Sequence, residues 1–164
     1  RAWPPEHYIA LARRLLAAGN AVAVIGLAED KPLAARIVAA CADAGCVDMT
    51  AYTKKVRDLL MLFHLAALLV SNDGAPGQFA ALTATPAIVF FGPETPALYG
   101  PIADNVFCFH SQIACSPCLT AYNHRQTPCD GDNQCLKTIS VDQVLDRAQQ
   151  MLVGKPPAAV AAAS

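Results

Sequence analysis

The stretch that decides the fold runs from position 71 to position 80 and reads Ser71-Asn72-Asp73-Gly74-Ala75-Pro76-Gly77-Gln78-Phe79-Ala80. It follows a short apolar run, and its small residues turn the chain into a helix that we place at 77–82. Small residues let a backbone approach a ligand closely, and a helix start offers unpaired N–H groups with partial positive charge. The pattern fits a pyrophosphate-binding turn in which Asp73 accepts hydrogen bonds from sugar hydroxyls. The residues alone also fit a plain strand–helix turn in which Asp73 fixes the backbone.

Short apolar runs alternate with helical patterns on both sides of this stretch. Strands are predicted at 21–25, 46–50, 68–71, 87–91 and 106–109, and the longer helices at 5–18, 32–44, 56–66 and 141–152. Ser140 and Gln143 form the capping box of the last helix. This alternation predicts an α/β fold with a parallel sheet, whose ligands bind outside the carboxyl ends of the strands. The loops of interest are therefore 26–31, 72–77 and 92–95.

Composition limits the classes of protein to consider. The chain has 164 residues, of which 54% are hydrophobic and 15% charged, and its net charge is −1. These values predict one packed domain and exclude a large electrostatic footprint for nucleic acid. The longest apolar run, 59–70, is shorter than the roughly 20 residues of a membrane span, and no signal peptide is visible. Because such a fold normally begins with a strand, we expect a preceding strand and a preceding domain in the parent protein.

Several motifs in register resemble glycosyltransferase family 9, the ADP-heptose:lipopolysaccharide heptosyltransferases. The family has Lys-x-Trp-Pro, a strand with a Gly-containing loop, Asp-Thr-Gly-Pro-x-His-Leu-Ala and Phe-Gly-Pro-Thr-x-Pro. The corresponding stretches here are Arg1-Ala2-Trp3-Pro4, Val24-Ile25-Gly26, Asp73 to Ala80, and Phe91-Gly92-Pro93-Glu94-Thr95-Pro96. The resemblance implies that 1–153 is the C-terminal, Rossmann-like half of a GT-B fold, which binds the nucleoside-diphosphate sugar. Residues 154–164 are expected to form a flexible tail.

The same resemblance implies an inverting sugar transfer that needs no divalent metal. The general base and the site for a glycan or lipid-linked acceptor would lie on the missing N-terminal domain, so this fragment alone would be inactive. The expected location is cytoplasmic, at the inner face of the cytoplasmic membrane. Carried over by position, the donor-binding residues are Arg1, Glu29 or Asp30, Tyr52, Thr53, Asp73, Gly74, Ala75, Gln78 and Gly92. Arg1 would contact the phosphates, the acidic residue the ribose, and 50–53 the base.

Three positions depart from the family pattern. Gly74 lacks the threonine hydroxyl, Ala75 replaces a glycine, and Gln78 cannot carry the charge of an imidazolium. A second hypothesis is therefore a degenerate, non-catalytic homologue that acts as a nucleotide-binding or assembly module. A third, another Rossmann-like nucleotide binder, is weakened because no Gly-x-Gly-x-x-Gly follows a strand.

The polar segment 111–138 carries most of the cysteines. Cys115, Cys118, Cys129 and Cys135 have the pattern Cys-x2-Cys-x10-Cys-x5-Cys, and a structural zinc ion, disulfides and free thiols all remain open for them. Three further cysteines, Cys41, Cys46 and Cys108, are expected in the core. So is His64, whereas His7 is expected on an exposed helix face and Trp3 under the first loop. His110 and His124 flank the segment as alternative ligands.

Overall fold

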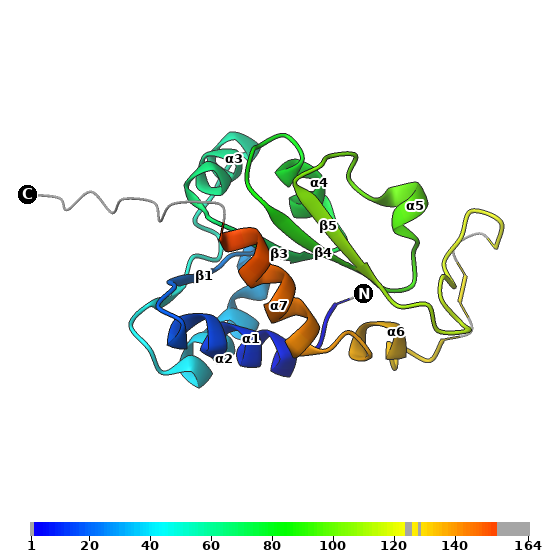
Figure 1. Ribbon diagram of the computed structural model, residues 1–164, viewed down its shortest axis with the longest axis horizontal. Helices are drawn as coiled ribbons and strands as arrows, with labels where there is room; N and C mark the ends of the chain where they lie inside the picture. The colour runs from blue at the N-terminus through cyan, green and yellow to red at the C-terminus, as the bar shows by residue number, and fades with distance from the viewer. Residues whose placement is uncertain (1, 124–125, 128, 154–164) are drawn as a thin grey trace, which may run out of the picture.

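The computed structural model describes residues 2–123, 126–127 and 129–153, and it confirms the predicted parallel α/β fold (Figure 1). The strands are β1 (Val22–Val24), β2 (Cys46–Asp48), β3 (Leu69–Asn72), β4 (Ala87–Phe91) and β5 (Val106–His110). The longer helices are α1 (Pro5–Ala17), α2 (Lys31–Cys41), α3 (Val56–Leu65) and α7 (Val141–Leu152). The short ones are η1 (Ala28–Asp30), α4 (Ala75–Ala80), α5 (Pro96–Tyr99) and α6 (Gln134–Lys137). The predicted tail, 154–164, lies outside the described residues.

The described strands form two parallel sheets. One pairs β1 with β2, and the other has the order β3-β4-β5. Because β3, β4 and β5 are parallel, their carboxyl ends meet at one edge, and the loops that follow them start there. Among the described residues β1 and β3 are each paired on one side only.

Helices cover both faces of the larger sheet, as expected for a strand such as β4 that is buried along its whole length. Ile88 and Phe90 belong to a core shared with α1, α6 and α7, whereas Ala87 belongs to a second core with Phe63 of α3 and Ala80 of α4. Figure 1 shows α1, α2 and α7 on one side of the β3-β4-β5 sheet and α3 and α4 on the other. The β3-β4-β5 sheet thus lies between two layers of helices.

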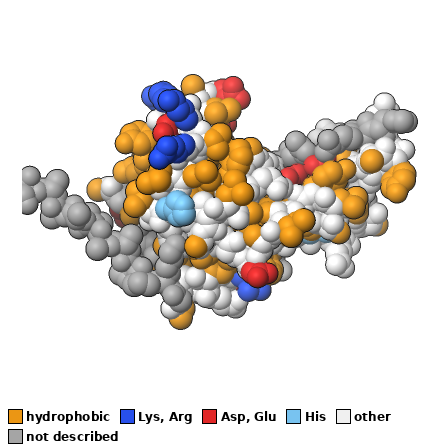
Figure 2. Space-filling model, turned by 90° about the horizontal axis from the view of Figure 1, so that it is seen from above, with side chains coloured by type: hydrophobic (Ala, Val, Ile, Leu, Met, Phe, Trp, Pro, Cys, Tyr) orange, Lys and Arg blue, Asp and Glu red, His pale blue; other side chains and the backbone are white. Residues whose placement is uncertain are grey.

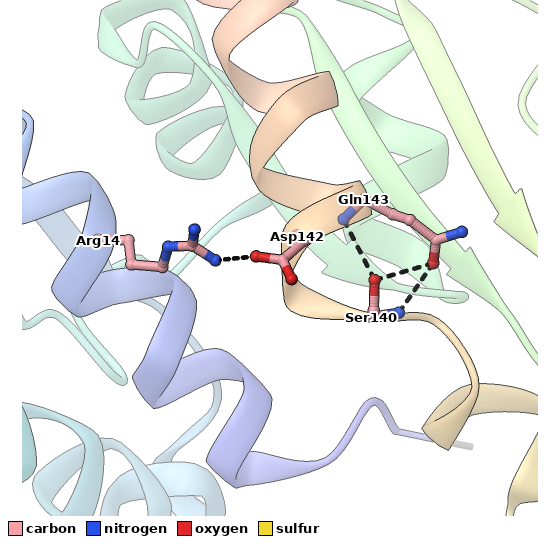
Figure 3. Close-up of polar contacts among 4 residues, drawn as sticks. All are labelled: Arg14, Ser140, Asp142 and Gln143. Atoms are coloured by element: carbon pink, nitrogen blue, oxygen red, sulfur yellow. Dashed lines mark hydrogen bonds and ion pairs between the residues drawn. The ribbon is translucent and has the colours of Figure 1, made fainter.

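The predicted capping box of α7 is present. The N–H of Gln143 donates to Ser140 Oγ over 3.3 Å, and the N–H of Ser140 donates to Gln143 Oε1 over 3.0 Å. In the same first turn of α7, Asp142 pairs with Arg14 of α1 (Figure 3). Both side chains of this pair are exposed, so it contributes about 0–1 kcal/mol, and the α1–α7 contact depends mainly on the apolar core beneath it.

Trp3 is the main anchor of the N-terminal segment. Its side chain is fully buried, stacks on Phe90 with ring centroids 4.6 Å apart, and donates from Nε1 to the carbonyl of Ile139 over 2.9 Å. The prediction that Trp3 packs under the first loop is therefore wrong, since its partners lie on β4 and before α7. An indole is large and carries one donor, so it fits a buried site that supplies both a flat apolar surface and an acceptor.

Two histidines differ from the sequence prediction. His64 is exposed. Because α3 is apolar around most of its circumference, its sequence does not show which side is buried, and in the structure only Phe63 of this helix is fully buried. His7 is half-buried, with its ring 5.0 Å from that of Trp3, and its Nδ1 is buried with no hydrogen-bond partner. Periodicity alone could not identify the buried face in either helix.

The face that lies uppermost in Figure 1, over α3 and α4, is turned toward the reader in Figure 2. Hydrophobic side chains are scattered over it, and Lys and Arg side chains gather near one end. The exposed apolar residues of this region are Val56, Met61, Leu65 and Leu82. Within the described ranges no helix is long and apolar enough to cross a bilayer.

Candidate functional site

The first group of candidate residues lies where β3 ends. Asp73 continues the strand, because its N–H donates to the carbonyl of Phe90 over 2.9 Å. Asn72, directly before it, accepts two hydrogen bonds on Oδ1, from the N–H of Trp3 at 2.8 Å and from the hydroxyl of Tyr8 at 2.9 Å. Burial raises the pKa of Tyr8, so its hydroxyl stays protonated and remains a donor. The N-terminal segment therefore fixes the position of the turn that starts at Asp73.

The two glycines of the turn have different structural roles. A Cβ on Gly77 would lie 2.9 Å from Val89 Cγ2, so this glycine is required for the close packing of α4 on β4. A Cβ on Gly74 would meet only Pro76 Cδ, at 3.9 Å, and Gly74 has an extended backbone, with φ 162° and ψ −171°. Neither packing nor backbone conformation requires Gly74. The space beside it is open to a ligand.

Helix α4 starts directly after Gly74. This helix begins at Ala75, two residues earlier than predicted, because Pro76 fits the first turn of a helix. No side chain caps it, and Ala75 is exposed. Gln78 is exposed too, and its Nε2 donates to the carbonyl of Tyr99 in α5 over 2.7 Å. Gln78 thus connects the turn to the short helix after β4.

The loop after β4 contacts residues of the cysteine-containing segment 111–138. Gly92 is buried, and a Cβ there would lie 2.7 Å from Leu136 Cγ, so the structure gives this glycine a packing role. Its carbonyl accepts from Ser116 Oγ over 2.7 Å, and Ser116 Oγ lies 3.2 Å from His110 Nε2. Burial lowers the pKa of His110, which favours a neutral ring that donates to Ser116. Sequence analysis missed this role of Ser116 and His110, since no local pattern links them to Gly92.

A second group lies after β1 and β2. The N–H of Ala51 donates to the carbonyl of Gly26 over 2.9 Å and joins the two loops. Asp48, also missed from sequence, accepts from the N–H of Thr50 at 2.8 Å and from its hydroxyl at 2.6 Å, and these bonds lower the pKa of Asp48. An Asp-x-Thr sequence at the end of a strand is the available signal for such a turn.

The remaining donor candidates of this group differ in how their polar atoms are used. Asp30 folds back onto its own loop, where Oδ2 accepts from the N–H of Leu27 over 2.8 Å. Glu29 is exposed beside it, Tyr52 is 70% exposed, and Thr53 is half-buried. Of the two acidic candidates for the ribose, Glu29 is thus the one without such an intra-loop bond in the structure. Arg1 lies outside the described residues.

No disulfide joins any of the seven cysteines in the structure. Cys46 is buried as predicted, whereas Cys41 and Cys108 are only half-buried. The other four line one cavity of about 240 Å³ together with Pro93 and Leu119. In the part of the chain that the structure describes, no three His, Cys, Asp or Glu side chains are already placed to hold a metal ion. His124, one of the alternative ligands, is outside that part.

The Asn72–Tyr8 contact gives a test of how the turn is positioned. Asn72→Ala leaves the buried Tyr8 hydroxyl without its acceptor, and we expect a loss of about 1–3 kcal/mol in the free energy of unfolding. Tyr8→Phe should cost less, and the double variant should lose less than the sum of the two, because the variants share one interaction. Urea denaturation of the four proteins measures the coupling. Strict additivity would contradict the contact.

Comparison with known proteins identifies the family of the chain. The model of glycosyltransferase family 9 (heptosyltransferase) matches residues 1–128. Lipooligosaccharide heptosyltransferase 2 of Haemophilus influenzae is 31% identical over 105 residues, which are 62% of this chain and 30% of that protein. Among solved structures, E. coli ADP-heptose LPS heptosyltransferase II superposes with a TM-score of 0.75 at 23% identity, over 93% of this chain and 42% of that one. E. coli heptosyltransferase WaaC with ADP gives 0.69 at 17% identity, over 91% and 39%. The chain thus spans less than half the length of each of these proteins.

Proposed function

Because the chain belongs to glycosyltransferase family 9, the heptosyltransferase family, we propose that it is the donor-binding half of a two-domain sugar transferase. The donor would be a nucleoside-diphosphate sugar such as ADP-heptose, and the acceptor a lipopolysaccharide-type glycan. The observation that carries the proposal is the turn at Gly74, where a glycine borders open space at the carboxyl edge of the sheet. ADP is the ligand named for one of the similar structures, which supports an adenine nucleotide.

The diphosphate would bind along the backbone of Gly74 and Ala75. A side chain at position 74 would project into space that no other group of the described chain fills within 3.9 Å. The following helix has no side-chain cap, so its first N–H groups are suited to phosphate oxygens. Asp73 would face the sugar hydroxyls rather than the phosphates, because two negative charges repel each other. Arg1 would add a cation with a bidentate fork.

The nucleoside would lie over the loops that follow β1 and β2. Glu29 is exposed there and would accept hydrogen bonds from the ribose hydroxyls, while Asp30 braces the loop through Leu27. The exposed ring of Tyr52 and the neighbouring Thr53 would border the base. The Ala51–Gly26 hydrogen bond holds these two loops together, so ribose and base would be bound by one unit.

In the proposed reaction an acceptor hydroxyl oxygen attacks the anomeric carbon of the donor. The bond from that carbon to the β-phosphate oxygen breaks, and the nucleoside diphosphate leaves with the electron pair. The hydroxyl proton passes to a base on the part of the protein that precedes this chain. The role of this chain is to stabilise the charge that develops on the leaving group, through preorganised donors near Gly74 and Arg1 and without a divalent metal.

The preceding part of the protein would also complete the sheet. Within the described part of the chain β1 and β3 each have one unpaired side, and α1 leads from the N-terminus toward β1. A strand placed between them and followed by α1 would join the two sheets by a right-handed parallel crossover. We propose that this strand and the acceptor domain precede Arg1, and that the enzyme works at the inner face of the cytoplasmic membrane.

Nucleotide binding to the complete polypeptide tests the proposal. ADP at 100 times its dissociation constant should add about 2.7 kcal/mol to the free energy of unfolding and raise the melting temperature by several degrees. NAD should give no comparable shift, because no Gly-x-Gly-x-x-Gly turn is present to bind its pyrophosphate. A larger response to NAD, or none to any nucleoside diphosphate, would contradict the proposal.

A transfer assay separates the enzyme from a degenerate homologue. Gln78 is neutral at every pH and donates to Tyr99, so it cannot act as a charged imidazolium would. If binding is retained, release of ADP from ADP-heptose with a heptose-free lipopolysaccharide acceptor is expected. Binding with no release would favour the assembly-module hypothesis.

A further inference from the structure

The segment between the end of β5 at His110 and the start of α6 at Gln134 has no helix or strand in its described residues. None of those residues is buried. Figure 1 shows the segment standing out at one end of the molecule, away from the packed layers. Loops of this length are uncommon in compact domains, and small natural units without a sufficient core often use disulfides or a structural metal ion for stability.

The turn that contains the first two cysteines of this segment is hydrogen-bonded to the loop after β4 through Ser116, Cys118 and Leu119. The N–H groups of Cys118 and Leu119 donate to the carbonyl of Pro93 over 2.9 and 2.8 Å, and Ser116 Oγ donates to the carbonyl of Gly92 over 2.7 Å. These hydrogen bonds hold the Cys-x2-Cys turn against the loop after β4 independently of any ligand.

Cys135 of α6 also lies next to the loop after β4. It is buried on α6, and a Cβ built on Gly92 would lie 3.2 Å from its Sγ. Cys129 lies on the remaining wall of the cavity that all four line.

We propose that Cys115, Cys118, Cys129 and Cys135 bind one zinc ion as four thiolates. Cys115 and Cys118 have zinc-knuckle spacing. Four soft sulfur ligands can form a tetrahedral site, which favours zinc over hard cations. Among the described residues the sulfurs are not gathered around a single point, so binding draws the exposed Cys115 and Cys129 toward Cys118 and Cys135. Each thiol gives its proton to solvent, so four protons leave for each zinc ion bound. Two disulfides would instead need an oxidant.

The proposal assigns the ion a structural role. A zinc ion at this site would connect the projecting segment to the Gly92–Pro93 loop and to α6, and so would hold the segment against the sheet edge. It takes no part in the sugar transfer. The zinc-site proposal can therefore be tested independently of donor binding.

Metal content of the complete polypeptide, purified under reducing conditions from zinc-supplemented medium, tests the proposal. Mass spectrometry of metals should find one zinc ion per chain, and a thiol-modifying reagent should release it. Cys129→Ser, at an exposed position, should lower the zinc content at least tenfold. The matched control Cys41→Ser, outside the cluster, should retain it.

Cobalt gives a second readout that does not depend on a variant. Cobalt(II) in place of zinc should show the sulfur-to-metal charge-transfer band and the intense visible bands of a tetrahedral thiolate site. Reduced protein with four free thiols and no bound metal would overturn the proposal. So would iron with sulfide in place of zinc, or intact masses that show two disulfides after purification with reductant. ADP titration of the same samples shows separately whether the donor site is formed.

Discussion

Gly74→Val is expected to weaken ADP binding by at least tenfold, or about 1.4 kcal/mol, while leaving the fold intact. The valine side chain would enter the open space beside the turn, where the structure places no group closer than 3.9 Å to the new Cβ. If a diphosphate occupies that space, the methyl groups exclude it. Isothermal titration calorimetry measures the affinity.

The stability of this variant distinguishes a lost site from a damaged fold. The extended backbone of Gly74 suits other residues, and replacing glycine at a compatible position stabilises a protein by about 0.4–1 kcal/mol. The melting temperature should therefore stay the same or rise. The matched control Ala84→Val, exposed and distant in the loop before β4, should leave ADP affinity unchanged. An unchanged affinity in Gly74→Val would place the diphosphate elsewhere.

Trp3→Ala is expected to destabilise the protein by about 3–5 kcal/mol, the largest effect of any single substitution considered. The change removes a fully buried indole, its stacking on Phe90 and its hydrogen bond to Ile139. Such a loss is a large fraction of the about 5–15 kcal/mol by which a typical domain is stable. Urea denaturation with circular dichroism measures the change.

Two further substitutions show what Trp3 contributes. Trp3→Phe keeps a ring over Phe90 but leaves the Ile139 carbonyl without its donor, so we expect a smaller loss. Ile102→Ala, at a fully exposed position, should change stability by no more than about 0.5 kcal/mol. A loss under about 1 kcal/mol in Trp3→Ala would contradict the anchoring role of the N-terminal segment.

Sequence patterns were sufficient where one physical signal dominates. The continuous apolar run 87–91 predicted β4 with its observed bounds, and Ser140 with Gln143 predicted the start of α7. Patterns failed where tertiary contacts decide the outcome. α5 and α6 have four residues each, too few for a hydrophobic period to appear. His64 lies on a helix that is apolar on several sides, so its exposure depends on which side meets the sheet.

The candidate site shows the same division. The turn at Asp73 and Gly74 was visible in the sequence because small residues follow an apolar run and precede a helical pattern. The support from Asn72, Tyr8 and Trp3 was not, because it joins residues more than sixty positions apart. Likewise, the packing role of Gly92 depends on Leu136, which no local pattern connects to it.

The central claim is that the backbone around Gly74 binds the diphosphate of an ADP-sugar. The most direct measurement is a titration of the ¹⁵N-labelled protein with ADP, followed by amide chemical shifts. The account predicts that the amides of Gly74, Ala75 and Gly77 shift most, together with those of the loops after β1 and β2. Shifts confined to other regions, with the 74–77 amides unmoved at saturation, would contradict it.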